Sequence, residues 1–561
     1  MLRSGLLVGV TAAAPSSLDK VTPGGIQSYS VARASEAASH DPGRYSDDEY
    51  QVFMHGVASG DPLPNSVVLW TRVTPDPSAT PGSGRGEDVH VEWEIARDAS
   101  ISDVVERGTA TASVATDHTV HVEPHTLKPY TQYFYRFTVR GGDHDGVTSP
   151  VGRTLTAPAD NTDLTKLRLA VCSCANYEAG YFRAYSDIAR RANDGEIDVV
   201  VHMGDYIYEY ASGEYAGKHG VARPHVPTWE LNTGADYRAR YGHYRRDPEL
   251  QAAHAAAPWV VTWDDHEFAD NAYAGGAVNH QPLEGDWNER RNGAMAAYLD
   301  WIPIRATNPS KGGHIYRSLR FGTLAEIHML DLRTYRTAPG KIGAGAFDGD
   351  RTIMGSEQFD WLAGRLSSSQ TRWNLVGTSV MMAPMNVVNV DSVIKGPLLD
   401  MIGQPSVNTS QLGLTANPDQ WDGYAADRFK LLDLLASTHP EARTVFLTGD
   451  IHSEWANAIE HKGKTVAAEL VCSSVTAKNI DDALKVPQNS PITRSVESML
   501  LSQNPHVKHV DLDAHGYALL TVDKAGAQMQ WMRVDDVETA GSPVSEGPQA
   551  VYRDREISVR A

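Results

Sequence analysis

Short apolar runs recur along this chain and stop abruptly at turn residues that are followed by polar side chains. Four of them are Leu167–Val171, Val199–Met203, Trp259–Trp263 and Thr444–Thr448. An apolar run of this length, bounded by turn residues, is typical of a buried strand. Open α/β sheets build their sites just past the carboxyl ends of such strands. The pattern therefore predicts one site assembled from four strand ends.

The side chains that follow the four runs are of the types that bind metal ions. In chain order they are Cys174 and Asn176, Asp205 and Tyr208, Asp264, Asp265 and His266, and Asp450 and His452. Oxygen ligands alone favour calcium, magnesium or manganese, whereas a thiolate beside oxygen favours iron or zinc. A set this large predicts more than one metal ion, as in the clamps used for displacement at phosphorus. His266 is a candidate acid for the leaving oxygen.

Each of these residues also has a simpler structural explanation. Asp264 or Asp265 could cap the turn that follows. His452 could be an ordinary loop histidine, and Tyr208 could pack as one aromatic among its neighbours. The recurrence at four strand ends, and not any single residue, favours the functional interpretation.

Residues 49–157 show only strand patterns. Short alternating runs occur at Ser66–Thr71, His90–Ile95, His118–Val122 and Gln132–Val139. About 100 residues with strands at this spacing indicate a small β-sandwich of the immunoglobulin or fibronectin type. No ligand cluster occurs there, so we expect a spacer or packing module, with carbohydrate binding as a lesser alternative.

Helical and strand patterns alternate from residue 163 to 535. Helices are predicted at 183–193, 236–256, 288–301, 356–366 and 425–437, and further strands at 325–330, 373–380 and 516–533. This interleaving predicts an α/β (α+β) domain. We divide the chain into a segment 1–48, the β-sandwich 49–157, the α/β domain 163–535 and a C-terminal tail 536–561.

Composition and charge limit the possible functions. The chain has 561 residues and a formal net charge of −20. This charge argues against nucleic acid as a main partner, because phosphate backbones attract basic surfaces. A site for an anionic substrate must therefore bring its positive charge locally, and bound cations would do so. No apolar run is long enough to span a membrane.

The cysteines do not indicate a disulfide framework, since the chain has only three. We expect only one of Cys172 and Cys174 to face the site, and Cys472 to be a small buried hydrophobe. His202 and His328 lie in the middle of predicted strands and are likewise expected in the core.

The N-terminus has the chemistry of an export signal. Met1–Ala14 combines one basic residue, a short apolar stretch and small residues, which is typical of a signal peptide with a thin basic region. We interpret it as the back half of a twin-arginine signal whose arginines lie upstream, with a disordered tail as the alternative. The residues up to about 48 are rich in Ser, Ala, Pro and Gly and indicate a linker.

Six motifs together resemble the PhoD-type alkaline phosphatases. They are His55–Pro62, Val67–Arg72, Ser173–Glu178, Gly204–Tyr210, Trp263–Glu267 and Thr448–His452. The resemblance implies a secreted phosphomonoesterase or phosphodiesterase with an N-terminal β-sandwich. Its catalytic domain would be similar to the four-layer sandwich of purple-acid-phosphatase-like metallophosphatases. The cofactors that it implies are one ferric iron, Fe3+, and two calcium ions, Ca2+.

The resemblance also implies roles for individual residues. The metal ligands would be Cys174, Asp205, Tyr208, Asp265, Asn271, Asp450 and His452. The first three would hold the iron, and Asp205 would bridge to calcium. Asp205 and His266 would be the catalytic residues, while Asn176 and Arg333 are candidates for contacting the substrate phosphate.

We therefore predict an exported monomer that releases phosphate from small organic phosphate esters at alkaline pH. The nucleophile would be a metal-bound hydroxide. A phospholipase D-like or other phosphodiesterase is the alternative within the same class. A non-catalytic, metal-stabilised surface protein is the alternative from a different class, because of the predicted β-sandwich.

Overall fold

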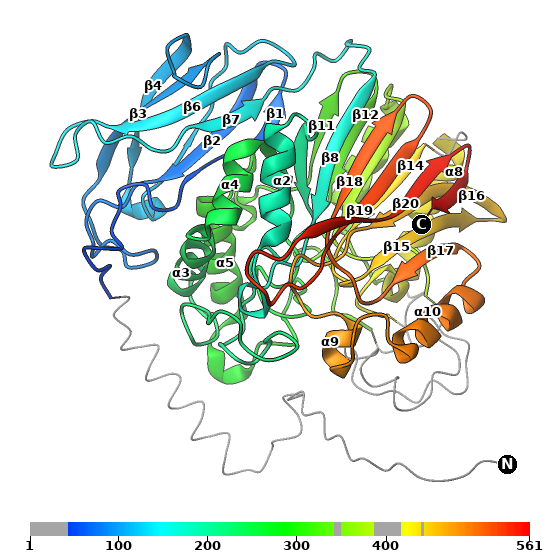
Figure 1. Ribbon diagram of the computed structural model, residues 1–561. Coiled ribbons are helices and arrows are strands. Elements are labelled where there is room, and N and C mark those ends of the chain that lie inside the picture. Colours follow the sequence, from blue (N-terminus) through cyan, green and yellow to red (C-terminus); the bar gives the residue numbers. More distant parts are fainter. Residues whose placement is uncertain (1–42, 341–348, 386–416, 439–442, 561) are drawn as a thin grey trace, which may run out of the picture.

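Three β-sheets organise the protein (Figure 1). The computed structural model describes residues 43–340, 349–385, 417–438 and 443–560. The largest sheet has ten strands, in the spatial order β21 (Glu556–Arg560), β20 (Val544–Arg553), β19 (Ala527–Val534), β18 (His515–Asp523), β8 (Lys166–Cys172), β9 (Val199–His202), β10 (Pro258–Val261), β1 (Val57–Leu63), β2 (Ser66–Arg72) and β5 (Thr119–Val122).

Two smaller sheets complete the β-structure. The seven-stranded sheet has the order β11 (Arg317–Phe321), β12 (Ala325–Met329), β13 (Trp373–Thr378), β14 (Thr444–Thr448), β16 (Lys464–Val471), β15 (Glu454–His461) and β17 (Val507–Asp511). The four-stranded sheet has the order β4 (Val104–Ala112), β3 (Val89–Ala96), β6 (Gln132–Val139) and β7 (Gly152–Leu155).

The two large sheets face each other across one apolar core. Val199, Val201 and Met203 enter this core from the ten-stranded sheet, and Leu447 enters it from the seven-stranded sheet. Val200 lies between Val199 and Val201 but packs into a different core on the helical side of β9. Burial on both faces explains why the run is continuously apolar and does not alternate.

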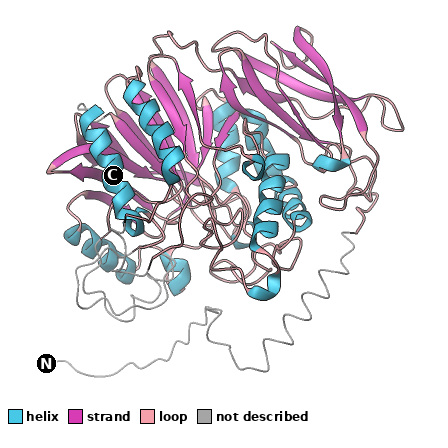
Figure 2. Cartoon of the chain, turned by 180° about the vertical axis from the view of Figure 1, so that it is seen from behind, coloured by secondary structure: helices cyan, strands magenta, loops and turns pink. Residues whose placement is uncertain are grey.

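Helices cover the outer faces of the two large sheets (Figure 2). Those on the ten-stranded sheet are α2 (Arg183–Asn193), α3 (Gly234–Arg245), α4 (Pro248–Ala256) and α5 (Trp287–Trp301). Those on the seven-stranded sheet are α6 (Gly355–Ser368), α8 (Ala425–Thr438) and α10 (Pro491–Gln503). The short helix α9 (Ile480–Leu484) precedes α10.

The single helix predicted at 236–256 is two helices. Proline has no N–H and fits best at the start of a helix, and Pro248 is the first residue of α4. Asp247 caps α4, because its carboxylate accepts hydrogen bonds from the N–H groups of Glu249 and Leu250. The prediction of one continuous helix was therefore wrong, although Asp247 and Pro248 are both sequence signals for the start of a helix.

The N-terminal strands divide between two sheets. Strands β1, β2 and β5 belong to the ten-stranded sheet, where β1 pairs in parallel with β10 through Ser59 and Pro258. The four-stranded sheet packs against their other face around a core that includes Leu69, Trp93 and Tyr135. Half of the predicted N-terminal module is thus continuous with the main sheet.

The last residues also extend the main sheet. After residue 535, where we expected a tail, β20 and β21 pair antiparallel with β19 and with each other. Within the described part of the chain, no helix has the length and apolarity required to cross a bilayer.

Candidate metal centre

The loops that follow four strands meet at one end of the two large sheets. The N–H of Cys174, after β8, donates to the carbonyl of Gly204, after β9, at 3.1 Å. Gly204 has φ +107°, and a Cβ there would lie 2.4 Å from Cβ of Asp264. A Cβ on Gly449, after β14, would lie 2.6 Å from Oγ of Ser173. Glycine at these two positions lets the four loops approach closely.

Five predicted ligands adopt left-handed backbone conformations. They are Cys174 (φ 61°), Asp205 (φ 53°), Asn271 (φ 55°), Asp450 (φ 64°) and His452 (φ 50°). This conformation is uncommon for residues other than glycine and marks backbone held by its surroundings, often at functional sites. The side chains of all of these residues except Asn271 belong to groups of potential ligand atoms.

Three groups of potential ligand atoms result, each with its atoms within 4.8 Å of one another. They are Cys174, Asp205 and His452; Asp205, Asp265 and His266; and Asp264, Asp265 and Asp450. Asp205 belongs to the first two groups and Asp265 to the last two. The structure therefore brings together seven of the candidate residues that follow the four strands, as linked groups and not as separate sites.

The chemistry of the groups fits different ions. The hydroxyl of Tyr208 joins the first group, since it lies 3.3 Å from Oδ2 of Asp205 and 3.2 Å from Nε2 of His452. Thiolate, phenolate, imidazole and carboxylate donors together favour a transition metal. The third group offers only carboxylates, which favour a hard cation such as calcium.

His452 is prepared to act as a ligand through one particular nitrogen. Its Nδ1 lies 2.7 Å from the carbonyl oxygen of Lys478, to which it can only donate. Burial lowers the pKa of His452 to about 3, so the imidazole is neutral. With the proton on Nδ1, the lone pair of Nε2 points toward Tyr208 and the first group, as in many metal-binding histidines.

The carboxylates at this site are buried at a cost that bound cations would offset. Burial raises the pKa of both Asp205 and Asp450 well above the usual range, and neighbouring aspartates raise it further. Oδ1 of Asp265 is buried without a hydrogen-bond partner. A concentration of poorly solvated carboxylates is the arrangement expected around metal ions.

Arg333 lies among these carboxylates. Its Nη2 lies 2.9 Å from Asp264 and 3.0 Å from Asp450, its Nη1 lies 2.9 Å from Asp419, and its Nε also donates to Asp264. The side chain is 0% exposed. Arg333 therefore pairs with carboxylates of the candidate ligand groups in this structure, and its role as a clamp for the substrate phosphate stays a prediction.

His266 is held by a buried carboxylate that sequence reasoning missed. Its Nδ1 lies 2.7 Å from Oε2 of Glu209, and Glu209 also accepts from the side chain of Asn279 at 2.9 Å. Burial alone would lower the pKa of His266, but the charges of Glu209, Asp265 and Asp205 raise it well above the usual value. This direction favours the protonated imidazole, the form that a general acid requires.

Comparison with known families identifies the family of this chain. The family model of the PhoD-like phosphatases matches residues 169–531, and that of the PhoD-like phosphatase N-terminal domain matches residues 37–158. The chain belongs to the PhoD-like phosphatase family. This PhoD-like phosphatase is accordingly a metal-dependent hydrolase of phosphoric esters, and the non-catalytic surface protein is excluded.

Individual relatives agree with this assignment. The phosphatase is 35% identical to alkaline phosphatase D of Bacillus subtilis (strain 168) over 529 residues, which cover 91% of this chain and 82% of the relative. A solved structure of PhoD superposes with a TM-score of 0.79 at 32% identity and covers 92% of this chain and 94% of that one. The purple acid phosphatase PPD1 of yellow lupin (Lupinus luteus) shares the fold, with a TM-score of 0.50 at 12% identity over 87% of this chain and 73% of that one.

A second carboxylate that the sequence did not reveal ties the loops of the phosphatase together. Glu267 accepts from the N–H groups of Asp205 at 3.0 Å, Tyr206 at 2.7 Å and Asp264 at 2.7 Å. Both Glu209 and Glu267 lie inside the motifs that carry the family resemblance. Their place inside these motifs was the one sequence signal for them. Only the fold shows that Glu209 contacts His266 and that Glu267 accepts hydrogen bonds from backbone N–H groups.

The two asparagines of the prediction are placed differently. The N–H of Asn271 donates to Asp265 at 2.5 Å, so its backbone is next to the ligand groups. Asn176 caps the 3-10 helix Tyr177–Ala179, and its amide nitrogen donates to the carbonyl of Tyr215 at 2.7 Å. Both polar atoms of the Asn176 side chain are thus bonded to backbone in this structure.

Only one of the two neighbouring thiols reaches the site, as expected. Cys174 follows the turn after β8 and joins the ligand group, while Cys172 ends β8 and packs into the core on the helical side. Residues two apart share a face of a strand, so the left-handed turn at Cys174 separates them. Cys472, His202 and His328 are fully buried in the core, which confirms those predictions.

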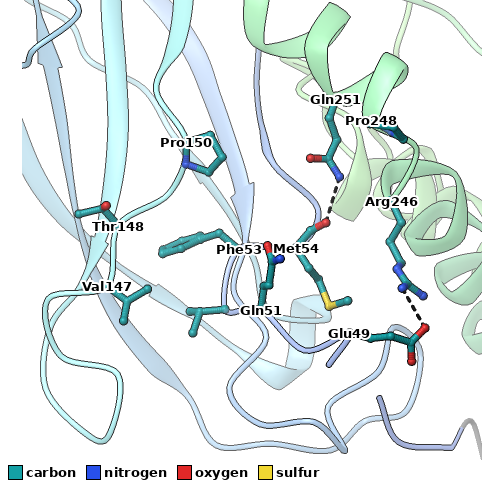
Figure 3. Close-up of a pocket in the computed structure, with 11 residues that line it drawn as sticks. Glu49, Gln51, Phe53, Met54, Val147, Thr148, Pro150, Arg246, Pro248 and Gln251 are labelled. Atoms are coloured by element: carbon teal, nitrogen blue, oxygen red, sulfur yellow. Dashed lines mark hydrogen bonds and ion pairs between the residues drawn. The ribbon is translucent and has the colours of Figure 1, made fainter. Parts of the chain in front are cut away.

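A cavity of about 670 Å³ lies away from the ligand groups of the phosphatase (Figure 3). Its walls include Phe53 and Met54 on the N-terminal side and Arg246, which pairs with Glu49 at 3.2 Å. None of the predicted site residues lines it. The strand-end cluster is therefore the candidate site of ester hydrolysis.

Proposed function

We propose that this PhoD-like phosphatase releases phosphate from small organic phosphate esters at alkaline pH, using one ferric iron and two calcium ions. One observation carries the proposal above all others. Asp205 belongs both to the group that contains a thiol and an imidazole and to the group that continues into the aspartates. A carboxylate shared in this way suits two unlike cations that act on one phosphoryl group.

The donor sets suggest which residues would hold each ion. Cys174, Asp205 and Tyr208 would hold the iron, with His452 beside them. Asp205, Asp264, Asp265 and Asp450 would hold the calcium ions, with Asn271 as a further oxygen donor. When bound, the ions would supply Lewis acidity to the phosphoryl oxygens and to the attacking water.

The protein itself would supply the proton and the orientation. The pairing of Nδ1 with Glu209 leaves Nε2–H of His266 to donate to the leaving oxygen of the ester. Glu267 would fix the relative positions of the Asp205 and Asp264 loops. Arg333 would balance the charge of Asp264 and Asp450 and leave the phosphate to the metal ions.

We further propose that the enzyme is exported, has a four-layer catalytic domain with an N-terminal β-sandwich, and is monomeric. Export by the twin-arginine route is supported by the signal-like chemistry of Met1–Ala14. A four-layer sandwich is supported by two facing sheets with helices on their outer sides. An immunoglobulin- or fibronectin-like module at 49–157 is supported by the core between the four-stranded sheet and β1, β2 and β5. We propose that the enzyme acts as a monomer.

Steady-state hydrolysis of p-nitrophenyl phosphate and its bis-ester tests the proposal. We expect turnover that rises from neutral to alkaline pH, is lost on chelation and returns with iron and calcium together. The ratio of the two rates would rank phosphomonoesterase against phosphodiesterase activity. Turnover that survives exhaustive chelation, or no turnover of either ester by the metal-loaded protein, would contradict it.

A further inference from the structure

Two basic residues near the ligand groups, Arg333 and Lys478, differ in their carboxylate partners. Arg333 pairs with Asp264, Asp419 and Asp450. Lys478 makes no ion pair with a carboxylate among the residues that the structure describes. In a chain with a net charge of −20, an uncommitted ammonium beside a phosphoester site is a candidate for binding substrate.

The backbone of Lys478 is fixed to the metal centre. Its carbonyl oxygen accepts the hydrogen bond from Nδ1 of His452 at 2.7 Å. The preceding residue, Ala477, packs in one cluster with Cys174 and Tyr208. The N–H of Ala477 also donates to the carbonyl of Cys174 at 3.1 Å. The lysine side chain therefore starts at the residue after Ala477, which itself contacts the predicted iron ligands Cys174 and Tyr208.

The side chain of Lys478 ends against the ring of Tyr215, which is close to the ligand groups. Nζ lies 4.4 Å from the centroid of the Tyr215 ring, as in a cation–π contact. Tyr215 in turn stacks on Tyr208 at 5.5 Å and on His266 at 6.1 Å between ring centroids. Tyr208 is fully buried, whereas Tyr215 is partly exposed.

Two carboxylates whose charges act on Lys478, those of Asp482 and Glu178, form direct contacts with other groups. Asp482 lies 2.8 Å from Nε2 of His515. Glu178 accepts from the hydroxyl of Ser212 at 2.8 Å and from the N–H of Gly213. These carboxylates are held in place by contacts of their own, so the ammonium remains available to an incoming anion.

We propose that Lys478 and Tyr215 form a subsite for a second anionic group of the ester, such as a carboxylate or another phosphate. The inference rests on the proposed function, in which the reacting phosphate lies over the Asp205 cluster. The ammonium lies against the Tyr215 ring and that ring stacks on Tyr208, so one ring stands in the series of contacts between Lys478 and the predicted iron ligand Tyr208. Lys478 thus meets a group several bonds away from phosphorus, and it determines specificity for doubly anionic esters.

Phosphate release from two matched esters tests this subsite. 3-Phosphoglycerate carries a carboxylate where glycerol 3-phosphate carries a hydroxymethyl group. In the metal-loaded enzyme, Lys478→Met should raise KM for 3-phosphoglycerate about tenfold and change kcat less than about threefold. KM for glycerol 3-phosphate should change less than about threefold. Lys478→Arg should restore most of the preference, because it restores the charge.

A matched control distinguishes direct contact between Lys478 and the substrate from the effect of removing any positive charge nearby. Lys485→Met removes the same charge with the same substitution from an exposed position seven residues further along. It should leave the ratio of the two KM values unchanged. A ratio that falls equally in Lys485→Met and Lys478→Met would contradict the subsite.

Binding of non-hydrolysable analogues gives a readout that does not need turnover. By calorimetry, Lys478→Met should weaken 3-phosphonopropionate about tenfold and leave propylphosphonate unchanged. If the wild type releases no phosphate from either ester, the proposed function fails, whereas this binding ratio still tests the subsite. Equal weakening of both phosphonates, or of neither, would overturn the assignment of Lys478 to a distal anionic group.

Discussion

The Glu209 carboxylate lies 2.7 Å from Nδ1 of His266, and the Glu209 side chain is fully buried. Because this charge raises the pKa of His266, Glu209→Gln should lower it and move the alkaline limb of the kcat profile to lower pH. We also expect kcat to fall about 10- to 100-fold, as for other residues that orient a reacting group.

Glu196→Gln is a matched control for this change. Glu196 pairs with Arg191 before the start of β9, at the opposite end of the strand from the site. Its pH profile should coincide with that of the wild type. An unchanged alkaline limb in Glu209→Gln would show that Glu209 does not act through His266.

Asp205→Asn tests the shared ligand. Losing the bridging charge should lower kcat/KM by about 1,000-fold or more, because metal ions supply several kcal/mol to the transition state. Asp198→Asn makes the same change just before β9, where Asp198 pairs with Arg168 at 2.7 Å, and should keep the activity. Comparable activity of the two variants, with both folded by circular dichroism, would disprove the role of Asp205.

Arg333→Met distinguishes a structural cation from a phosphate clamp. Removing it leaves buried carboxylates without a partner, which costs about 3–5 kcal/mol and should lower the thermal midpoint by several degrees. Arg365→Met removes a half-exposed partner of Glu326 and should cost at most about 1 kcal/mol. A raised KM with an unchanged midpoint would instead support the clamp that the sequence suggested.

The stability of the metal-free protein should depend on Glu267. Burial raises the pKa of Glu267 from 4.5 to about 7 in the folded protein. The folded state therefore binds an extra proton between these values, and stability falls as pH rises through that window. Glu267→Gln should flatten this part of the dependence in denaturant titrations of chelated protein from pH 4.5 to 7. An equally steep fall in the variant would contradict the assignment.

The clustering of the candidate residues was largely predictable because strand ends and ligand types coincide in the sequence. Each apolar run identified its strand, and the next few residues supplied candidate ligands such as Asp205, Asp265 and His452. The sequence could not predict which charged side chains form ion pairs with one another. Arg333 follows β12, and it meets Asp264 and Asp450 only because the ends of strands from both large sheets converge.

The fold was predictable locally but not where distant segments pair. The helix over 183–193 has the predicted bounds, because a strong apolar period determines it. The pairing of Ser59 in β1 with Pro258 in β10 joins residues about 200 positions apart, and no local pattern encodes it. The sequence therefore predicts the N-terminal strands but does not show that β1, β2 and β5 continue the main sheet.

In the proposed centre, Asp205 joins an iron site, completed by Cys174 and Tyr208, to a calcium site. The most direct test is the visible absorption spectrum of the purified protein together with its iron and calcium content, for the wild type and Tyr208→Phe. We expect one iron and two calcium ions per chain and a tyrosinate-to-iron band that Tyr208→Phe abolishes. An active wild type without iron or the band, or a band that survives in Tyr208→Phe, would contradict the account.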